Sequence, residues 1–228
     1  MEQFIPGSEH ALEGMLEEGT LTSLALFDKP DPLDGPYFEE TIYVTPSRLP
    51  QALQNRIHEE VARACRCAGL QTGPIHAEVR VNEEGVWILE IAARSIGGLC
   101  GRALTHLVGM SLEELILRHA LGERAPAAGE RGAAGVMMIP IPRRGIFRGV
   151  EGKAEALSVP YVTGVALTAE PGQIVAPPPE GASYLGFIYS RADRPAQAEA
   201  ALRDAHRMLR FEITPEYPAA HASAAGVS

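Results

Sequence analysis

Two glutamates, Glu78 and Glu90, interrupt a stretch that otherwise reads as two short buried strands. The runs "IHAEVRV" and "VWILEIAAR" flank "NEEG", a loop of hairpin length that ends in glycine, so we expect them to pair antiparallel. By alternation, Glu78 shares its predicted face with polar neighbours. Glu90 instead follows Val86 and Ile88 on its predicted face, where a carboxylate is costly unless it is paired or bound to a cation.

The residues alone leave two interpretations of this acid pair open. One is an ordinary solvated sheet face, which explains Glu78 better than Glu90. The other is a cation site made by two carboxylates that meet across the hairpin. Paired oxygen donors of this kind suit a hard ion such as Mg²⁺, which commonly bridges carboxylates to nucleotide phosphates.

The elements that must position these acids are strands with a few helices. Residues 1–30 predict strands around the "EEG" turn, residues 38–49 a short strand that leads toward a helix, and residues 50–69 an amphipathic helix ended by glycine. A second helix is predicted over 111–123, with Ser111 as its N-cap and Glu114 at the capping-box position.

The chain divides by composition into four predicted parts. We expect a first lobe over residues 1–123, a linker over 124–135 in the Gly/Pro-rich stretch "RAPAAGERGAAG", and a smaller α+β subdomain over 136–215 made of strands and one helix. The tail, 216–228, has too little apolar content to pack and is expected to be disordered.

Charge and composition exclude several classes of function. The chain has 228 residues, of which 46% are hydrophobic and 21% charged, and its net charge is −9. Since it has no Lys/Arg-rich block, we expect no nucleic-acid partner. The sequence has no membrane-length apolar run and no signal-peptide pattern, which favours a cytoplasmic protein without a membrane partner. Its three cysteines are expected to be reduced, and a catalytic role for Cys100 has no supporting pattern.

The blocks "MEQFIPGSEHALEGML" and "GPIHAEVRVNEEGVWILEIAARSIGG", separated by a predicted helix, resemble the later half of an ATP-grasp domain. The pattern is similar to carboxylate–amine ligases of the L-amino-acid ligase type, and more distantly to biotin carboxylase and D-alanine–D-alanine ligase. It covers about residues 1–122. Residues 124–215 resemble the C-terminal subdomain of L-amino-acid ligases, above all in "LGFIYSRADRPAQAEAALRDA".

This resemblance implies a fold and a reaction. The fold is α+β: the C-terminal lobe of an ATP-grasp fold, an antiparallel sheet with helices, followed by a smaller α+β subdomain. The reaction uses ATP to activate a small-molecule carboxylate as an acyl phosphate, which an amine then attacks to form an amide or peptide bond.

The resemblance also assigns the nucleotide contacts. The hinge strand between the two lobes, whose backbone receives the adenine edge and whose apolar side chains pack on the ring, matches Glu2, Gln3, Phe4 and Ile5. Backbone recognition needs an extended segment and little side-chain identity, so this motif is short.

The metal and substrate contacts follow in the same way. Glu78 and Glu90 match the two acids that hold Mg²⁺ (or Mn²⁺) against the ATP phosphates, and the metal neutralises phosphate oxygens there. Arg94 matches a catalytic arginine near the transferred phosphate or the substrate carboxylate; a surface salt bridge is its ordinary alternative. The glycine-containing loop that approaches the substrate acid matches "SIGGLCG", with Ser95, Gly97 and Gly98 as its possible contacts.

Three further polar residues lie beside these motifs. Lys29 in "FDKPDP" is explained either by loop solubility or by a phosphate or substrate contact of the kind the family often has there. His10 and His76 are expected to be structural or surface histidines.

Two features depart from the family pattern. Where the family usually has an asparagine as a further metal ligand, two residues after the second acid, this sequence has Ala92. In addition, the family's earlier half, with its lysine-bearing strand and glycine-rich phosphate loop, does not precede Met1. We therefore expect this chain to need that half, in cis or in trans, for turnover. The alternatives are a non-catalytic binding or partner domain derived from such an enzyme, and a biotin-carboxylase-like carboxylase.

Overall fold

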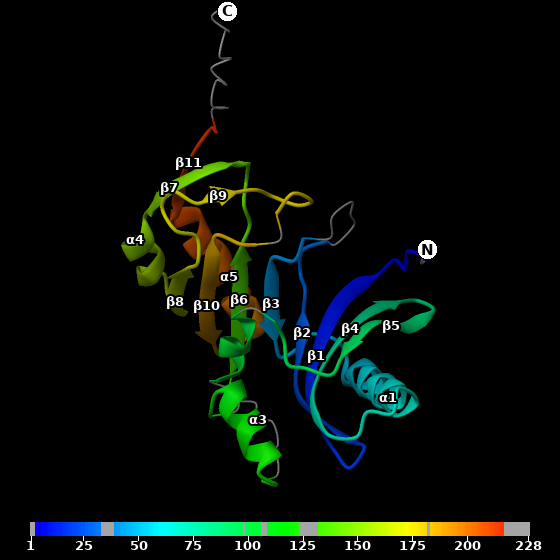
Figure 1. Ribbon diagram of the computed structural model, residues 1–228. Coiled ribbons are helices and arrows are strands. Elements are labelled where there is room, and N and C mark those ends of the chain that lie inside the picture. The colour runs from blue at the N-terminus through cyan, green and yellow to red at the C-terminus, as the bar shows by residue number, and fades with distance from the viewer. Residues whose placement is uncertain are drawn as a thin grey trace, which may run out of the picture.

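The computed structural model describes residues 3–32, 39–97, 99–105, 109–123, 132–181 and 183–216 (Figure 1). Within these residues the strands form two sheets. The larger is an 8-stranded sheet in the order β5-β4-β1-β2-β3-β6-β10-β8, and the smaller is 3-stranded in the order β11-β7-β9. The pairings are antiparallel, which confirms the prediction of an α+β chain built on an antiparallel sheet with helices.

The first half of the chain supplies two hairpins that lie side by side. Their strands are β1 (Ser8–Glu17), β2 (Thr20–Asp28), β4 (Gly73–Asn82) and β5 (Gly85–Ala92). β1 pairs with both β2 and β4, so the central strand of this half is the first one in the sequence. The β1–β2 turn contains Glu18 and Gly19, both with positive φ, as the "EEG" turn predicted.

Helix α1 (Gln51–Cys67) covers one face of this half of the sheet. Its buried stripe, Ile57, Val61 and Cys65, packs in one cluster with the inward-facing side chains of β4. The helix is followed by Gly69 at φ +76, a conformation that glycine adopts without strain. The prediction of a glycine-ended amphipathic helix is thus confirmed, and the packing fixes which face of β4 is apolar.

Asp28, at the end of β2, connects the sheet to the segment that leads into α1. Its buried carboxylate accepts hydrogen bonds from His10 Nδ1 at 3.1 Å, Ser47 Oγ at 2.5 Å and both the backbone N and Nε of Arg48 at 2.9 Å. Burial alone would raise the pKa of Asp28, but these donors outweigh it and the pKa is lowered.

The second half of the chain extends the same sheet rather than forming a sheet apart from it. β3 (Ile42–Thr45) meets β2 at one residue pair and then runs along β6 (Ala133–Ile139), which is followed across the sheet by β10 (Gly186–Ala192) and β8 (Val162–Leu167). β6 already begins at Ala133, so the last three residues of the predicted linker are strand. Residues 124–131 and 217–228 lie outside the described residues.

The remaining elements surround this half. Helices α4 (Lys153–Ser158) and α5 (Pro195–Met208) belong to its core cluster, and the small sheet consists of β7 (Gly145–Glu151), β9 (Ile174–Val175) and β11 (Arg210–Thr214). β8 and β9 follow one another in the sequence but belong to different sheets. Figure 1 shows the small sheet beyond one end of β6 and β10.

The face of the large sheet opposite α1 is covered only in part. The short helices η1 (Cys100–Leu104) and α3 (Leu112–Ala120) pack there against Ala11, Phe27 and Tyr43. Ser111 caps α3, as predicted, with its Oγ accepting from Glu114 N at 3.1 Å. In the described part of the chain, no helix is long and apolar enough to cross a membrane.

Candidate active site

The polar residues of interest line up across three neighbouring strands. β1 places Ala11 opposite Glu78 and Glu13 opposite His76. β5 then places Glu90 opposite Glu78, and Ala92 opposite His76. Directly opposed residues of an antiparallel pair project from the same face of a sheet. The two glutamates singled out in the sequence therefore meet across the hairpin, on the face that α1 does not cover.

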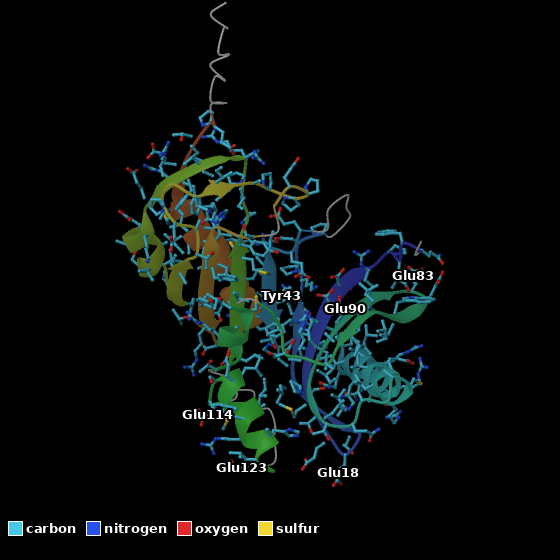
Figure 2. All side chains as sticks on the ribbon, in the orientation of Figure 1. Glu18, Tyr43, Glu83, Glu90, Glu114 and Glu123 are labelled. Atoms are coloured by element: carbon cyan, nitrogen blue, oxygen red, sulfur yellow. The ribbon has the colours of Figure 1, made fainter. Side chains whose placement is uncertain are left out.

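A β-bulge corrects the predicted face of Glu90. Simple alternation along β5 put Glu90 on the apolar face with Val86 and Ile88. The register shifts between Glu78 and Val79, so β5 carries one extra residue there, and Val86, Ile88 and Ile91 pack toward α1 while Glu90 opposes Glu78. The Glu90 side chain is 57% exposed, so its carboxylate does not carry the cost of burial among apolar groups. In Figure 2, Glu83 marks the hairpin tip and Glu90 lies farther back along β5.

Lys29, for which the sequence allowed either loop solubility or a phosphate or substrate contact, is a buried cation that contacts three of the acids. Its side chain is only 2% exposed, and Nζ lies 2.7 Å from Glu9 Oε1 and 3.0 Å from Glu78 Oε1. It also donates to Glu40, and it lies 5.0 Å from the centroid of the Tyr43 ring. Solubility does not explain such a lysine, because burying an ammonium needs compensating charge.

The charges in this cluster depend on one another. Burial alone would lower the pKa of Lys29, but attraction to Glu40, Glu78 and Glu9 outweighs it, and the pKa is raised. The pKa of Glu78 falls to about 2, chiefly through a hydrogen bond with His76 and in addition through Lys29. Burial raises the pKa of Glu40. Glu78 is therefore ionised at neutral pH and available as an oxygen donor.

Glu13 and His76 form a second, deeper pair beside Glu78. Glu13 is 1% exposed; its Oε1 contacts His76 Nδ1, and its Oε2 accepts from the backbone N of Ile96 at 3.1 Å. His76 Nε2 lies 3.5 Å from Glu78 Oε1. Burial alone would lower the pKa of His76, but the two glutamates raise it to about 9, while burial raises the pKa of Glu13. His76 is thus a buried member of the site rather than a surface histidine.

The other predicted contacts lie at the rim of this face. Arg94 is 56% exposed, with its guanidinium 3.8 Å from Glu90 and 3.0 Å from the carbonyl oxygen of Ser95. At Gly97 an added Cβ would meet no atom within 4 Å, so the loop backbone is open to approach. Gly98, the third predicted loop contact, lies outside the described residues.

The expected hinge strand is not a strand in the part that the structure describes. Gln3, Phe4 and Ile5 have no strand pairing, and Glu2 lies outside the described residues. The segment is fixed instead through Arg80, which donates to the carbonyl oxygen of Ile5 at 2.7 Å and lies over the Phe4 ring at 4.9 Å. The segment is therefore attached to β4 through a side chain rather than through strand pairing.

The donor set at the hairpin fits a magnesium ion. Glu78 and Glu90 supply carboxylate oxygens from adjacent strands, the ligand type that Mg²⁺ prefers. Carboxylate oxygens of Glu9, Glu40 and Glu78 also lie within 4.8 Å of one another, but the ammonium of Lys29 already contacts all three. Lys29 is the cation of that second group.

Sequence reasoning missed Glu9, Glu13 and Glu40. Glu9 and Glu13 alternate with Ala11 on β1, so a period-two reading of "SEHALEG" could have placed them on the face of Glu78. Nothing local indicated Glu40, which reaches Lys29 only because β3 lies beside β2. Cys100, which we did not expect to be catalytic, is buried, and burial raises the pKa of its thiol to about 12. That pKa disfavours a thiolate nucleophile.

Comparisons with known proteins agree with this fold. Residues 1–103 match the family model of the ATP-grasp domain, and residues 137–214 match that of the L-amino acid ligase C-terminal domain 2. The alanine–anticapsin ligase of Bacillus subtilis (strain 168) is 28% identical over 110 residues, which make up 47% of this chain and 22% of that protein.

Solved structures give the same result. The L-amino acid ligase from Bacillus licheniformis superposes with a TM-score of 0.83 at 27% identity, covering 93% of this chain and 53% of that one. Phosphoribosylglycinamide synthetase from Anaerococcus prevotii (TM-score 0.75, 13% identity, 93% and 55%) and biotin carboxylase from Campylobacter jejuni (0.69, 16%, 94% and 48%) share the fold alone. The chain thus spans about half the length of these solved relatives. The two matched regions together span most of the chain, which is thus similar in sequence and fold to ATP-grasp enzymes of the L-amino acid ligase type.

Proposed function

We propose that this chain is the metal-binding portion of an ATP- and Mg²⁺-dependent carboxylate–amine ligase, which joins a carboxylate and an amine through an acyl phosphate. The observation that carries the proposal is the direct opposition of Glu78 and Glu90 on the uncovered face of the sheet, beside the buried Lys29. The similarity to L-amino acid ligases supports an amino acid as one of the two substrates.

The residues of this chain have distinct parts in that reaction. Glu78 and Glu90 would hold the Mg²⁺, which when bound supplies charge neutralisation at the phosphate oxygens. Lys29 pairs with Glu9 and Glu40, and Arg80 also pairs with Glu9 at 3.0 Å, so that these acids can lie together without the metal. Arg94 lies exposed at the rim, 3.8 Å from Glu90 and bonded to the Ser95 carbonyl oxygen, and would turn from Glu90 toward a phosphate or a substrate carboxylate.

The nucleotide base would bind near residues 3–5. Residues 3–5 have no strand pairing and the Phe4 ring is half exposed, so the adenine ring would pack against Phe4. The loop of Ser95 and Gly97 would approach the substrate acid. Its neighbour Ile96 is bonded to Glu13, which ties the loop to the row of acids.

A calorimetric titration of the chain with ATP, with and without Mg²⁺, tests this proposal. We expect Mg²⁺-dependent binding that is lost in Glu90→Gln and kept in Glu83→Gln, the matched control at the exposed tip of the same hairpin. If the binding is indifferent to Mg²⁺ or survives Glu90→Gln, the metal assignment is wrong. The N-terminal half of a longer L-amino acid ligase can also be added in trans. If ATP does not bind even then, the alternative of a non-catalytic partner domain replaces the proposal.

A further inference from the structure

A serine, a histidine and an aspartate form a hydrogen-bonded chain on the face of the sheet that α1 covers. Ser8 Oγ lies 2.9 Å from His10 Nε2, and His10 Nδ1 lies 3.1 Å from Asp28 Oδ1. The two β1 residues alternate with Glu9, and Leu12, the next in their row, packs in the cluster of α1. The three side chains are therefore separate from the row of acids that the ligase proposal uses.

The ionised Asp28 decides which nitrogen of the imidazole carries the proton. Burial alone would raise its pKa, but hydrogen bonds from His10, Ser47 and Arg48 outweigh burial and lower the pKa of this carboxylate. A carboxylate can only accept, so His10 Nδ1 is the donor. In the neutral imidazole, Nε2 then has a lone pair that accepts from the hydroxyl of Ser8. A base held in this tautomer by a carboxylate is the arrangement that activates a serine in nucleophilic catalysis.

Exposure increases along these three residues from the acid toward the serine. Asp28 is 5% exposed and His10 is 4% exposed, so the carboxylate and the imidazole are shielded from water. Ser8, in contrast, is exposed at the start of β1, where its hydroxyl can meet a substrate. A structural role for His10 explains its bond to Asp28 across the β1–β2 pair. It does not explain the contact with Ser8, because an exposed hydroxyl has water as a partner and needs no imidazole.

A second serine–histidine pair in the same half of the chain lacks the acid. Ser23 Oγ lies 2.7 Å from His58 Nδ1, and no carboxylate is bonded to this imidazole among the residues that the structure describes. With no acceptor to fix its tautomer, His58 can donate to the serine as readily as it can accept from it. The chain therefore contains its own control, because only one of its two serine–histidine contacts has an oriented base.

We propose that Ser8 is a nucleophile with His10 as its general base and Asp28 as the positioning residue, and that the chain cleaves simple oxygen esters there as a second activity. The bond from Oγ to the acyl carbon forms as the ester C–O bond breaks, and the proton of Ser8 passes through His10 Nε2 to the leaving alcohol. Water then attacks the acyl-serine, returns a proton to Oγ by way of the same nitrogen, and releases the acid. Neither step involves ATP, so this inference is independent of the proposed function.

Labelling the full chain with a fluorophosphonate tests the nucleophile directly. The phosphorus of the probe bonds to the serine oxygen as fluoride leaves, so mass spectrometry of the intact chain and its peptides shows whether and where it reacts. We expect one adduct per chain, at Ser8, and none in Ser8→Ala, which should fold normally because this position is exposed. His10→Ala should slow the labelling by about 100-fold or more, a typical contribution of a general base.

Matched variants separate catalysis from structure. Ser23→Ala removes the serine of the pair without an acid and should leave the labelling rate unchanged. Asp28→Asn and Ser47→Ala both remove a hydrogen bond that the buried carboxylate makes, but only Asp28→Asn removes the charge that fixes the tautomer of His10. Measured per folded molecule, labelling should fall at least about tenfold in Asp28→Asn and stay within about twofold of the wild type in Ser47→Ala.

Hydrolysis of p-nitrophenyl acetate tests the ester reaction itself. We expect release of p-nitrophenolate above background, and its loss both after fluorophosphonate labelling and in Ser8→Ala. Acetylation of the exposed Cys67 would also release p-nitrophenolate, so Cys67→Ala is assayed in parallel and should keep the activity.

Three results would overturn the inference. They are the absence of an adduct at Ser8, a labelling rate that does not change in His10→Ala, and ester hydrolysis that persists after Ser8 is labelled or is absent from the unlabelled chain. Equal labelling of Ser23 would also refute it, since that serine has a histidine without an acid. Each of these results leaves the test of the ligase proposal, Mg²⁺-dependent binding of ATP, unaffected.

Discussion

Removing the charge of Lys29 gives the sharpest test of how this site is held together. Lys29→Met would remove the cation that contacts Glu9, Glu40 and Glu78, whose carboxylate oxygens lie within 4.8 Å of one another, while Arg80 would still pair with Glu9 at 3.0 Å. Two like charges at that distance repel by about 3 kcal/mol at an effective dielectric constant near 20. Breaking a buried ion pair by removing one partner typically costs about 3–5 kcal/mol, which agrees with this figure.

Protonation sets an upper limit on the loss and makes it depend on pH. A glutamate that cannot ionise takes a proton instead, which from a normal pKa near 4.3 costs about 4 kcal/mol at pH 7. We therefore expect Lys29→Met to lower the free energy of unfolding by about 3–4 kcal/mol at pH 7. The raised pKa of the trapped acids means that the folded variant binds more protons than its unfolded chain, so the loss should shrink as the pH falls toward 5.

The assay is urea unfolding at pH 7 and pH 5, followed by the fluorescence of Trp87, the single tryptophan of the chain. Lys153→Met is the matched control, since Lys153 is the only other lysine and is exposed on α4. It should change stability by no more than about 0.5 kcal/mol. A loss below about 1 kcal/mol at pH 7 for Lys29→Met, or one that does not diminish at pH 5, would show that the cluster is not held by this charge.

Three further predictions concern the scaffold. Asp28→Asn should lower the free energy of unfolding by about 2–4 kcal/mol at pH 7, measured by urea unfolding. Because folding lowers the pKa of Asp28, its carboxylate stabilises the fold at pH values above the unfolded-state pKa near 4. The difference in stability between the wild type and the variant should therefore narrow as the pH falls below about 4. Gly152, at φ +83, lies so close to Met208 that the Cβ of Gly152→Ala would be 1.9 Å from the carbonyl oxygen of Met208, so this variant should have a strongly lowered melting temperature. Gly172, at φ +92, has no atom within 4 Å of an added Cβ, so Gly172→Ala should lower the free energy of unfolding by only about 1 kcal/mol. Equal effects of the two variants would exclude the clash as the cause. In the native protein a thiol reagent should modify the exposed Cys67 quickly and the two buried cysteines only after unfolding, so three fast thiols in the folded state would contradict the burial.

Local sequence patterns determined the parts of this protein whose residues interact within a few positions of one another. The apolar stripe and following glycine of α1, the Ser111 cap of α3 and the antiparallel hairpin of β4 and β5 were all predicted, and all are present. Each depends on helix periodicity, a single capping side chain or a short turn, which are encoded in adjacent residues.

Tertiary structure decided the chemistry of the site. The bulge that turns Glu90 away from the apolar face is a mismatch between two strands and cannot be read from either one. The cation partner of Glu9 and Glu40 is Lys29, brought to them by the pairing of β1, β2 and β3, and His76 acquires its backing carboxylate only because β1 lies beside β4. Burial and charge pairing are properties of strands that are distant in sequence, so the residue types alone could suggest a metal site but not what surrounds it.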